Sequence, residues 1–124
     1  MPAPAATLKR LGRSARIGPS GDFARLRLQG QRMVLGCLIA NWSKLPDGFA
    51  PKLGVVTSKK IGGAVQRNRA RRLLRESFRQ HQHQLALPVE IILVARNSIA
   101  GRTFAEVEKD YLTTLRRAGL LKQT

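Results

Sequence analysis

The residues of this sequence best suited to chemistry are cationic and lie close together, between positions 58 and 79. Two lysines and a glycine pair open the segment, and residues 67–79 then hold six arginines against one acid, Glu76. Like charges four residues apart on a helix repel each other, and a solvated helix face usually mixes signs. A basic stripe of a single sign therefore predicts contact with a polyanion rather than a catalytic centre.

The spacing within this segment predicts how the cations are displayed. A strand over residues 52–58 leads through Gly62-Gly63 into a helix from Ala64 to about Leu85, which contains no glycine or proline. The backbone N–H groups at such a helix start can hold phosphate. One helix face is predicted to be apolar and to hold Ala70, Leu73, Leu74, Ser77 and His81. The opposite face is predicted to hold Asn68, Arg71, Arg72, Arg75 and Arg79. Arg67, Arg71 and Arg75 recur every fourth residue, with Arg72 and Arg79 beside them, which predicts a row of guanidinium groups about 18 Å long from Arg67 to Arg79.

Other side chains offer little for catalysis. His81 and His83 are two residues apart on a predicted helix and point in different directions, without a partner at metal-ligand spacing. The only cysteine, Cys37, lies in an apolar run and is predicted to be a small core residue. Trp42 precedes a turn, where it could stack on a base or pack against the sheet. We therefore expect no catalytic residue and no metal ligand in the protein itself.

Composition supports a polyanionic partner. The chain has 124 residues and a formal net charge of +16, with a sequence pI near 11.8. Residues 1–80 carry 17 bases and 3 acids, whereas residues 81–124 carry 6 bases and 4 acids, so the charge is concentrated in one part of the chain. No apolar run approaches the ~18 residues that cross a bilayer, and the first residues do not resemble a signal peptide. We expect a cytoplasmic protein without a membrane partner.

The length predicts one domain. Residues 1–19 are predicted to be a basic, flexible arm, and residues 20–124 a single domain. A short helix is expected after Asp22, ending near Gly30. A strand over residues 33–40 is expected to pair with residues 52–58 as an antiparallel hairpin. Residues 89–95 are apolar throughout and predict a central strand, and a closing helix is expected from Phe104 to about Leu121.

Residues 59–79 match the pattern Lys-Lys-x-Gly-x-Ala-Val-x-Arg-Asn-Arg-x-(Lys/Arg)-Arg-x-x-Arg-Glu-x-Phe-Arg without a gap. In this motif the chain resembles the protein subunit of bacterial ribonuclease P. The order of expected elements is similar too, and the resemblance covers roughly residues 20–118. It implies a compact α/β sandwich of the α+β class, similar to domain 2 of ribosomal protein S5. Such a fold has a small central sheet, about three helices and a left-handed βαβ crossover, a handedness that is rare.

The resemblance also implies a function. The protein would bind a large catalytic RNA and the 5′ leader of precursor tRNA, and would assist endonucleolytic removal of the leader. Catalysis and most Mg²⁺ binding would belong to the RNA, and no obligate protein partner is expected. By position, the residues that contact the catalytic RNA would be Lys59, Lys60, Arg67, Asn68, Arg69, Arg71, Arg72, Arg75 and Arg79.

The leader would lie in a cleft between the first helix and the sheet. Phe23 would line this cleft, and Arg27 stands at or next to a position where the family often has a second aromatic residue. Cys37 falls near another aromatic position, so the cleft is expected to be less aromatic than is usual. A structural RNA-binding protein of the ribosomal type is the alternative, and a basic DNA-architectural protein fits less well.

Overall fold

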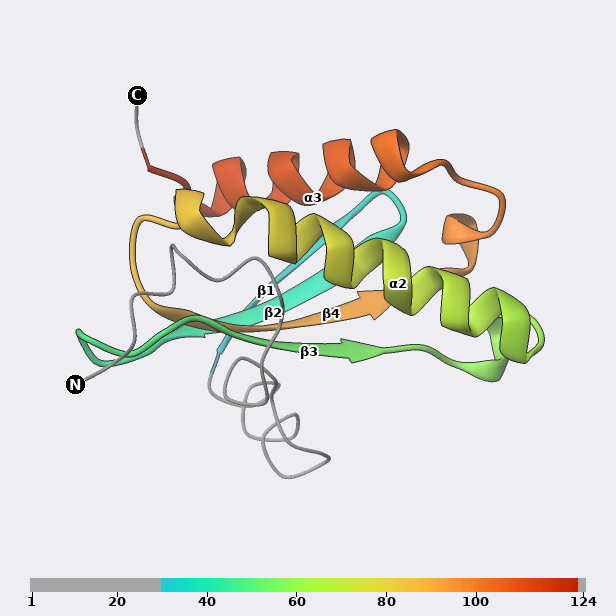
Figure 1. The fold of residues 1–124 in the computed structure, drawn as a ribbon, viewed down its shortest axis with the longest axis horizontal. Helices are drawn as coiled ribbons and strands as arrows, with labels where there is room; N and C mark the ends of the chain where they lie inside the picture. The colour runs from blue at the N-terminus through green and yellow to red at the C-terminus, as the bar shows by residue number, and fades with distance from the viewer. Residues whose placement is uncertain (1–29, 123–124) are drawn as a thin grey trace.

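The computed structural model describes residues 30–122, which form a four-stranded sheet with two α-helices on one face (Figure 1). The strands are β1 (Gln31–Leu35), β2 (Leu38–Lys44), β3 (Lys52–Val56) and β4 (Val89–Ala95), and the α-helices are α2 (Ala64–His81) and α3 (Phe104–Ala118). Three short 3₁₀ turns are η3 (Lys59–Ile61), η4 (Gln82–Gln84) and η5 (Asn97–Ile99). The α+β class is confirmed. The predicted arm and first helix lie outside the described residues.

Strand β4 occupies the interior of the sheet, whose order is β1-β2-β4-β3. It runs antiparallel to β2 and parallel to β3, and all of its residues except Val94 are buried. Ile91 packs into the core beneath the helices, and Ile92, on the opposite face, is only 2% exposed. The prediction of a central strand covered on both faces is thus confirmed. An apolar strand buries more apolar surface in the middle of a sheet than at its edge, and this burial favours the central position.

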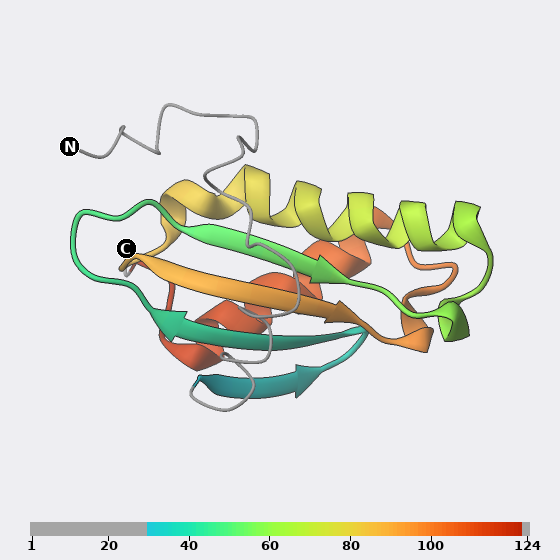
Figure 2. The ribbon, with the colours of Figure 1, turned by 90° about the horizontal axis from the view of Figure 1, so that it is seen from below.

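The connection from β3 through α2 to β4 is a left-handed crossover. Figure 2 shows the sheet from the side away from the helices, with β3 and β4 pointing the same way and α2 behind them. With these two strands pointing upward in that view, β4 lies to the right of β3, which is the left-handed arrangement. The handedness implied by the family resemblance is therefore present, and α2 runs along the outer strand β3.

The strand predicted over residues 33–40 is instead two strands, β1 and β2, separated by a tight turn at Gly36-Cys37. Gly36 has a φ of 57°, which suits the first central position of a two-residue hairpin turn. The backbone N–H of Cys37 donates to Asp110 Oδ2 of α3 at 3.0 Å. The turn is therefore docked onto a helix that is distant in sequence, a contact that apolar patterning does not reveal.

The predicted hairpin between residues 33–40 and 52–58 is wrong as well. Strand β2 pairs with β1 and β4, and β3 pairs with β4 alone. The loop between β2 and β3 crosses the end of the sheet, so that β4 can insert between the two strands. Sequence proximity favoured the hairpin, but the burial of β4 on both faces outweighs it.

Both helices end slightly before their predicted limits. Helix α2 gives way to η4 after His81, and α3 stops at Gly119, whose φ of 75° is left-handed. Helix α3 begins with a capping box in which Thr103 and Glu106 bond each other's backbone N–H groups. These two helices are joined by His81 Nε2 and Glu108 Oε2 at 2.8 Å.

The core lies between the sheet and the two helices. Its largest fully buried side chains include Tyr111 and Phe78, and the buried side of α2 holds Ala70, Leu74 and Ser77 as predicted. Cys37 is fully buried, which confirms its assignment to the core. Burial and the neighbouring Asp110 carboxylate raise the pKa of the Cys37 thiol to about 12.

The Gly36 turn yields a prediction with a matched control. A Cβ at Gly36 would lie 2.1 Å from Asp110 Oδ2, whereas a Cβ at Gly101, where φ is also positive at 78°, meets nothing within 4 Å. We expect Gly101→Ala to cost about 1 kcal/mol from left-handed strain alone. Gly36→Ala should cost about 2–4 kcal/mol, since it also displaces the carboxylate from a partly buried N–H group. Urea unfolding followed by circular dichroism measures both, and equal losses would contradict the Asp110 contact.

Candidate nucleic-acid interface

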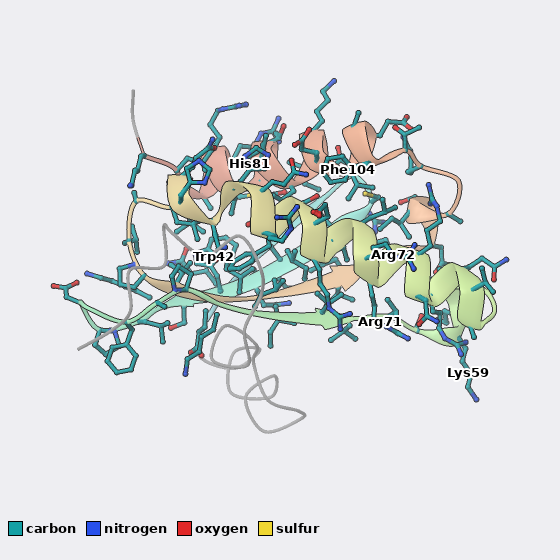
Figure 3. All side chains as sticks on the ribbon, viewed as in Figure 1. Trp42, Lys59, Arg71, Arg72, His81 and Phe104 are labelled. Atoms are coloured by element: carbon teal, nitrogen blue, oxygen red, sulfur yellow. The ribbon has the colours of Figure 1, made fainter. Side chains whose placement is uncertain are left out.

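The cationic segment begins where β3 ends and turns sharply into α2. Ile61 is 7% exposed and anchors η3, while Lys59 and Lys60 remain exposed. Gly62 has a φ of 141°, a conformation that side chains rarely adopt. Lys59 extends away from the molecule beside the first turn of α2 (Figure 3). The glycine pair thus places both ammonium groups next to the helix start.

Arg71 is held by two neighbours. Its Nη1 donates to Thr57 Oγ1 at 2.6 Å, and its Nη2 donates to Asn68 Oδ1 at 2.9 Å. Figure 3 shows Arg71 on the side of α2 that faces β3, and Arg72 on the outer side of the helix. Because an arginine has five N–H donors, these two bonds orient the guanidinium while leaving donors for a phosphate.

Arg67 and Arg69 are held by backbone carbonyl groups on opposite sides of the helix. Arg67 Nη1 donates to Gly62 O at 3.0 Å, within the glycine turn. Arg69 Nη2 donates to Arg102 O at 2.6 Å, in the connection between β4 and α3. The arginines of α2 are therefore spread around its exposed arc. The row predicted from the four-residue spacing describes only part of the arrangement.

Near the end of the helix, Arg79 forms a two-pronged ion pair with Glu76. The Arg79 Nε lies 2.8 Å from Glu76 Oε1, and Nη2 contacts the same carboxylate. The hydrogen bonds from Arg79 lower the pKa of Glu76, and Glu76 raises the pKa of Arg79. Glu76 therefore stays ionised and offsets part of the charge at this end, so the cationic surface is strongest toward the start of α2.

The structure adds Arg96 and Arg102 to the surface, and sequence reasoning missed both. They flank η5, which packs against η3, and both are exposed. Arg96 Nη1 donates to Gly36 O at 3.0 Å, and Arg102 Nε donates to Ser98 O at 3.1 Å. The sequence around Arg96 and Arg102 has no spacing pattern that would mark them as part of a binding surface. Only the tertiary contact between η3 and η5 brings this pair beside the start of α2.

The acids of α3 have structural partners. Glu108 bonds His81, Asp110 accepts from Cys37 N, and hydrogen bonds from Thr103 lower the pKa of Glu106. Within residues 30–122, no group of three or more His, Cys, Asp or Glu side chains is placed to hold a metal ion. In the same part of the chain, no helix is long and apolar enough to cross a membrane.

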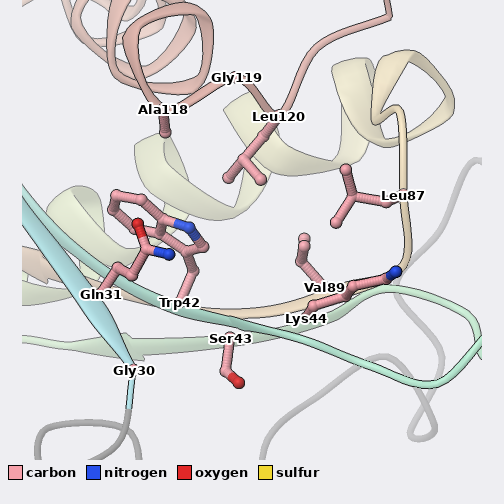
Figure 4. Close-up of a pocket in the computed structure, with 10 residues that line it drawn as sticks. All are labelled: Gly30, Gln31, Trp42, Ser43, Lys44, Leu87, Val89, Ala118, Gly119 and Leu120. Atoms are coloured by element: carbon pink, nitrogen blue, oxygen red, sulfur yellow. The ribbon is translucent and has the colours of Figure 1, made fainter.

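Trp42 packs rather than projecting into solvent, and it is 6% exposed. Its indole lines a hollow of about 330 Å³ at the opposite end of the molecule from Lys59, between the β1–β2 ribbon and the end of α3 (Figure 4). Gln31 lies over the ring, and Leu120 and Val89 form apolar walls. Of the two alternatives left open by the sequence, the structure favours packing.

The fold and this surface together define a small α+β protein that presents an ordered array of guanidinium groups, as a nucleic-acid-binding subunit does. The family model described as Ribonuclease P matches residues 11–119. The chain belongs to the ribonuclease P protein family.

Relatives and solved structures agree with this assignment. The ribonuclease P protein component of Syntrophomonas wolfei is 37% identical over 112 residues, covering 89% of this chain and 92% of that protein. The one from Gluconacetobacter diazotrophicus is 33% identical over 109 residues, covering 87% and 94%. The Staphylococcus aureus RNase P protein matches with a TM-score of 0.78 at 27% identity, over 87% of this chain and 98% of that one. The Thermotoga maritima RNase P protein shares the fold, with a TM-score of 0.73 at 24% identity, over 82% and 96%.

The contact between Thr57 and Arg71 can be tested by a double-mutant cycle. Thr57→Val keeps the side-chain shape and the net charge but removes the acceptor that orients the guanidinium. We expect it to weaken RNA binding about threefold, the size of one modest hydrogen bond. In an Arg71→Ala background the same change should have no further effect, because the group that Thr57 positions is gone. Filter binding at constant salt measures this, and additive losses would contradict a positioning role.

Proposed function

We propose that this chain, as the protein component of ribonuclease P, binds the catalytic RNA through α2 and its flanking turns. The observation that carries the proposal is the ordered set of guanidinium groups at the start of α2, held by the carbonyl groups of Gly62 and Arg102 and the hydroxyl group of Thr57. Arginines that are already oriented lose less side-chain entropy on binding than those of an extended arm. The proposed RNA-contacting residues are those of the sequence motif together with Arg96 and Arg102.

The protein's contribution is electrostatic. Its cations reduce repulsion among phosphates and release counterions, which favours close approach of the catalytic RNA and the substrate. Mg²⁺ would supply the metal-assisted hydrolysis within the RNA. The described acids support this division of labour, since four of them are engaged by Arg79, Thr103, His81 and the Cys37 N–H group. The subunit would act in the cytoplasm with its RNA partners.

We further propose that the leader of precursor tRNA lies on the sheet face away from α2 and α3. Strand alternation places Leu53 in the core and Lys52 on this other face. The strand registers align Arg32 with Asn41, and Lys52 with Glu90 and then Ser43. Arg32 is exposed and Lys52 and Ser43 are half-buried, whereas Asn41 and Glu90 are buried, so Arg32 and Lys52 are the cations that this face offers to the leader. The proposed leader contacts Phe23 and Arg27 lie outside the described residues.

The RNA contact is tested by replacing Arg67, Arg71 and Arg75 together with alanine. A control of equal charge loss replaces Lys109, Arg116 and Arg117, which lie on the exposed side of α3. We expect the α2 triple variant to weaken catalytic-RNA binding by at least tenfold and to flatten its salt dependence, and the α3 control to change both much less. Unfolding curves establish that each variant is folded. Equal effects of the two variants would show that total charge, rather than the α2 surface, determines binding.

The leader contact is tested with Phe23→Ala in reconstituted holoenzyme. Stacking of a base on an aromatic ring contributes about 1–3 kcal/mol, so precursor carrying a leader should bind roughly tenfold more weakly. Mature tRNA, which lacks the leader, should bind as it does with the parent protein. Equal losses for the two RNAs, or a variant that does not fold, would assign Phe23 to the core instead.

A further inference from the structure

Phe49 is unusual among the aromatic residues that the structure describes. Its side chain is 53% exposed, whereas Trp42 is 6% exposed and both Phe78 and Tyr111 are fully buried. Phe49 belongs to the loop between β2 and β3, which lies at the end of the molecule away from the start of α2 (Figure 1). A single exposed apolar side chain is common on protein surfaces, so the significance of Phe49 depends on what lies around it.

The loop holds this ring in a defined place. Phe49 N donates to Pro46 O at 3.3 Å, and Gly48 between them has a φ of 92°, as a type II turn requires at its third residue. Leu45 N donates to Pro88 O at 2.8 Å, which ties the loop to the connection between α2 and β4. Pro51 follows the turn and restricts the backbone further. The exposure of Phe49 therefore does not require a freely moving loop.

A hollow of about 230 Å³ lies beside the ring. Phe49 and Pro51 line one side, and Leu85 and Leu87 contribute apolar surface from the α2–β4 connection. Lys122 joins the rim, and its position is set by a bond from its own N–H group to Gln84 O at 2.7 Å. The site thus joins three chain segments that are fixed to one another by backbone hydrogen bonds.

Charge around the hollow favours an anion. Lys122 lines the hollow, and Lys52 begins the strand that follows the loop. The loop contributes one carboxylate, Asp47, which is exposed. A flat apolar ring beside ammonium groups suits a nucleotide, whose base can stack while its phosphate contacts a lysine.

We propose that Phe49 and Lys122 form a subsite for an unpaired nucleotide of the precursor-tRNA leader, beyond the part that lies on the sheet. The inference rests on the proposed function, because the sheet face proposed to hold the leader ends at Lys52, next to this loop. A leader that follows that face toward its end reaches Phe49. The single-stranded leader is the suitable occupant, since its bases are free to stack without disrupting a helix.

The test uses reconstituted holoenzyme and precursors with leaders of about two and about ten nucleotides. Phe49→Leu retains apolar volume but removes the aromatic face. It should weaken binding of the long-leader precursor by about tenfold and leave the short-leader precursor unchanged. Phe49→Trp should retain binding, and its fluorescence should be quenched when the long leader binds. Lys109→Gln, at an exposed position on α3 away from both the sheet face and this loop, is the control and should leave the preference for the long leader unchanged.

The outcomes separate this subsite from the general function. If Phe49→Leu binds both precursors like the parent and Phe49→Trp is not quenched, the subsite is wrong. The α2 triple variant tests the RNA contact independently, so its loss of binding would leave the proposed function standing. If Phe49→Leu retains binding of the long-leader precursor and Phe49→Ala loses it, the contact is apolar rather than aromatic, as with a protein partner. This result would also overturn the nucleotide assignment. Equal loss for both leaders would place Phe49 outside the leader path.

Discussion

The insertion of β4 between β2 and β3 is the constraint on which the rest of the structure depends. Because β4 is buried on both faces, the chain cannot close β2 and β3 into a hairpin and must return to the middle of the sheet. The return path from parallel β3 is α2, which consequently lies along the outer strand with one side packed and a broad arc exposed. The sheet topology therefore decides which side of α2 is exposed, and the helix periodicity decides that the arginines lie on that side.

The concentration of arginines on one helix is a cost in the isolated protein. Neighbouring like charges on a helix oppose folding by a few tenths of a kcal/mol per pair. The protein offsets this cost mainly with neutral acceptors, such as the carbonyl of Gly62 and the side chains of Thr57 and Asn68. Neutral acceptors orient a guanidinium without cancelling its charge, whereas a carboxylate does both. Glu76, which pairs with Arg79, is a carboxylate partner of this second kind, and it lies toward the end of α2 away from the glycine turn.

Much of this could be predicted from the sequence, and the failures have identifiable causes. Apolar periodicity located α2, β4 and α3 because each buries a long, uniform face. The break of residues 33–40 into two strands was missed, since Gly36 is a weak signal inside an apolar run. Asp110, which accepts the hydrogen bond from Cys37 N in the turn, is 73 residues away from Cys37. The arginines of α2 were found from their spacing. Arg96 and Arg102 were not, because the contact between η3 and η5 that brings them to the surface is tertiary.

The burial of Cys37 has a practical consequence for studying the ribonucleoprotein. It is the only cysteine of the chain, it is fully buried, and its pKa is raised to about 12, so little of the reactive thiolate forms near neutral pH. A cysteine introduced on the exposed arc of α2 would be the one fast-reacting thiol, and a fluorophore could be attached there without removing the native residue. Conversely, the Cys37 thiol can be modified only when the core opens around it. The rate of its modification therefore measures how often the sheet and α3 separate.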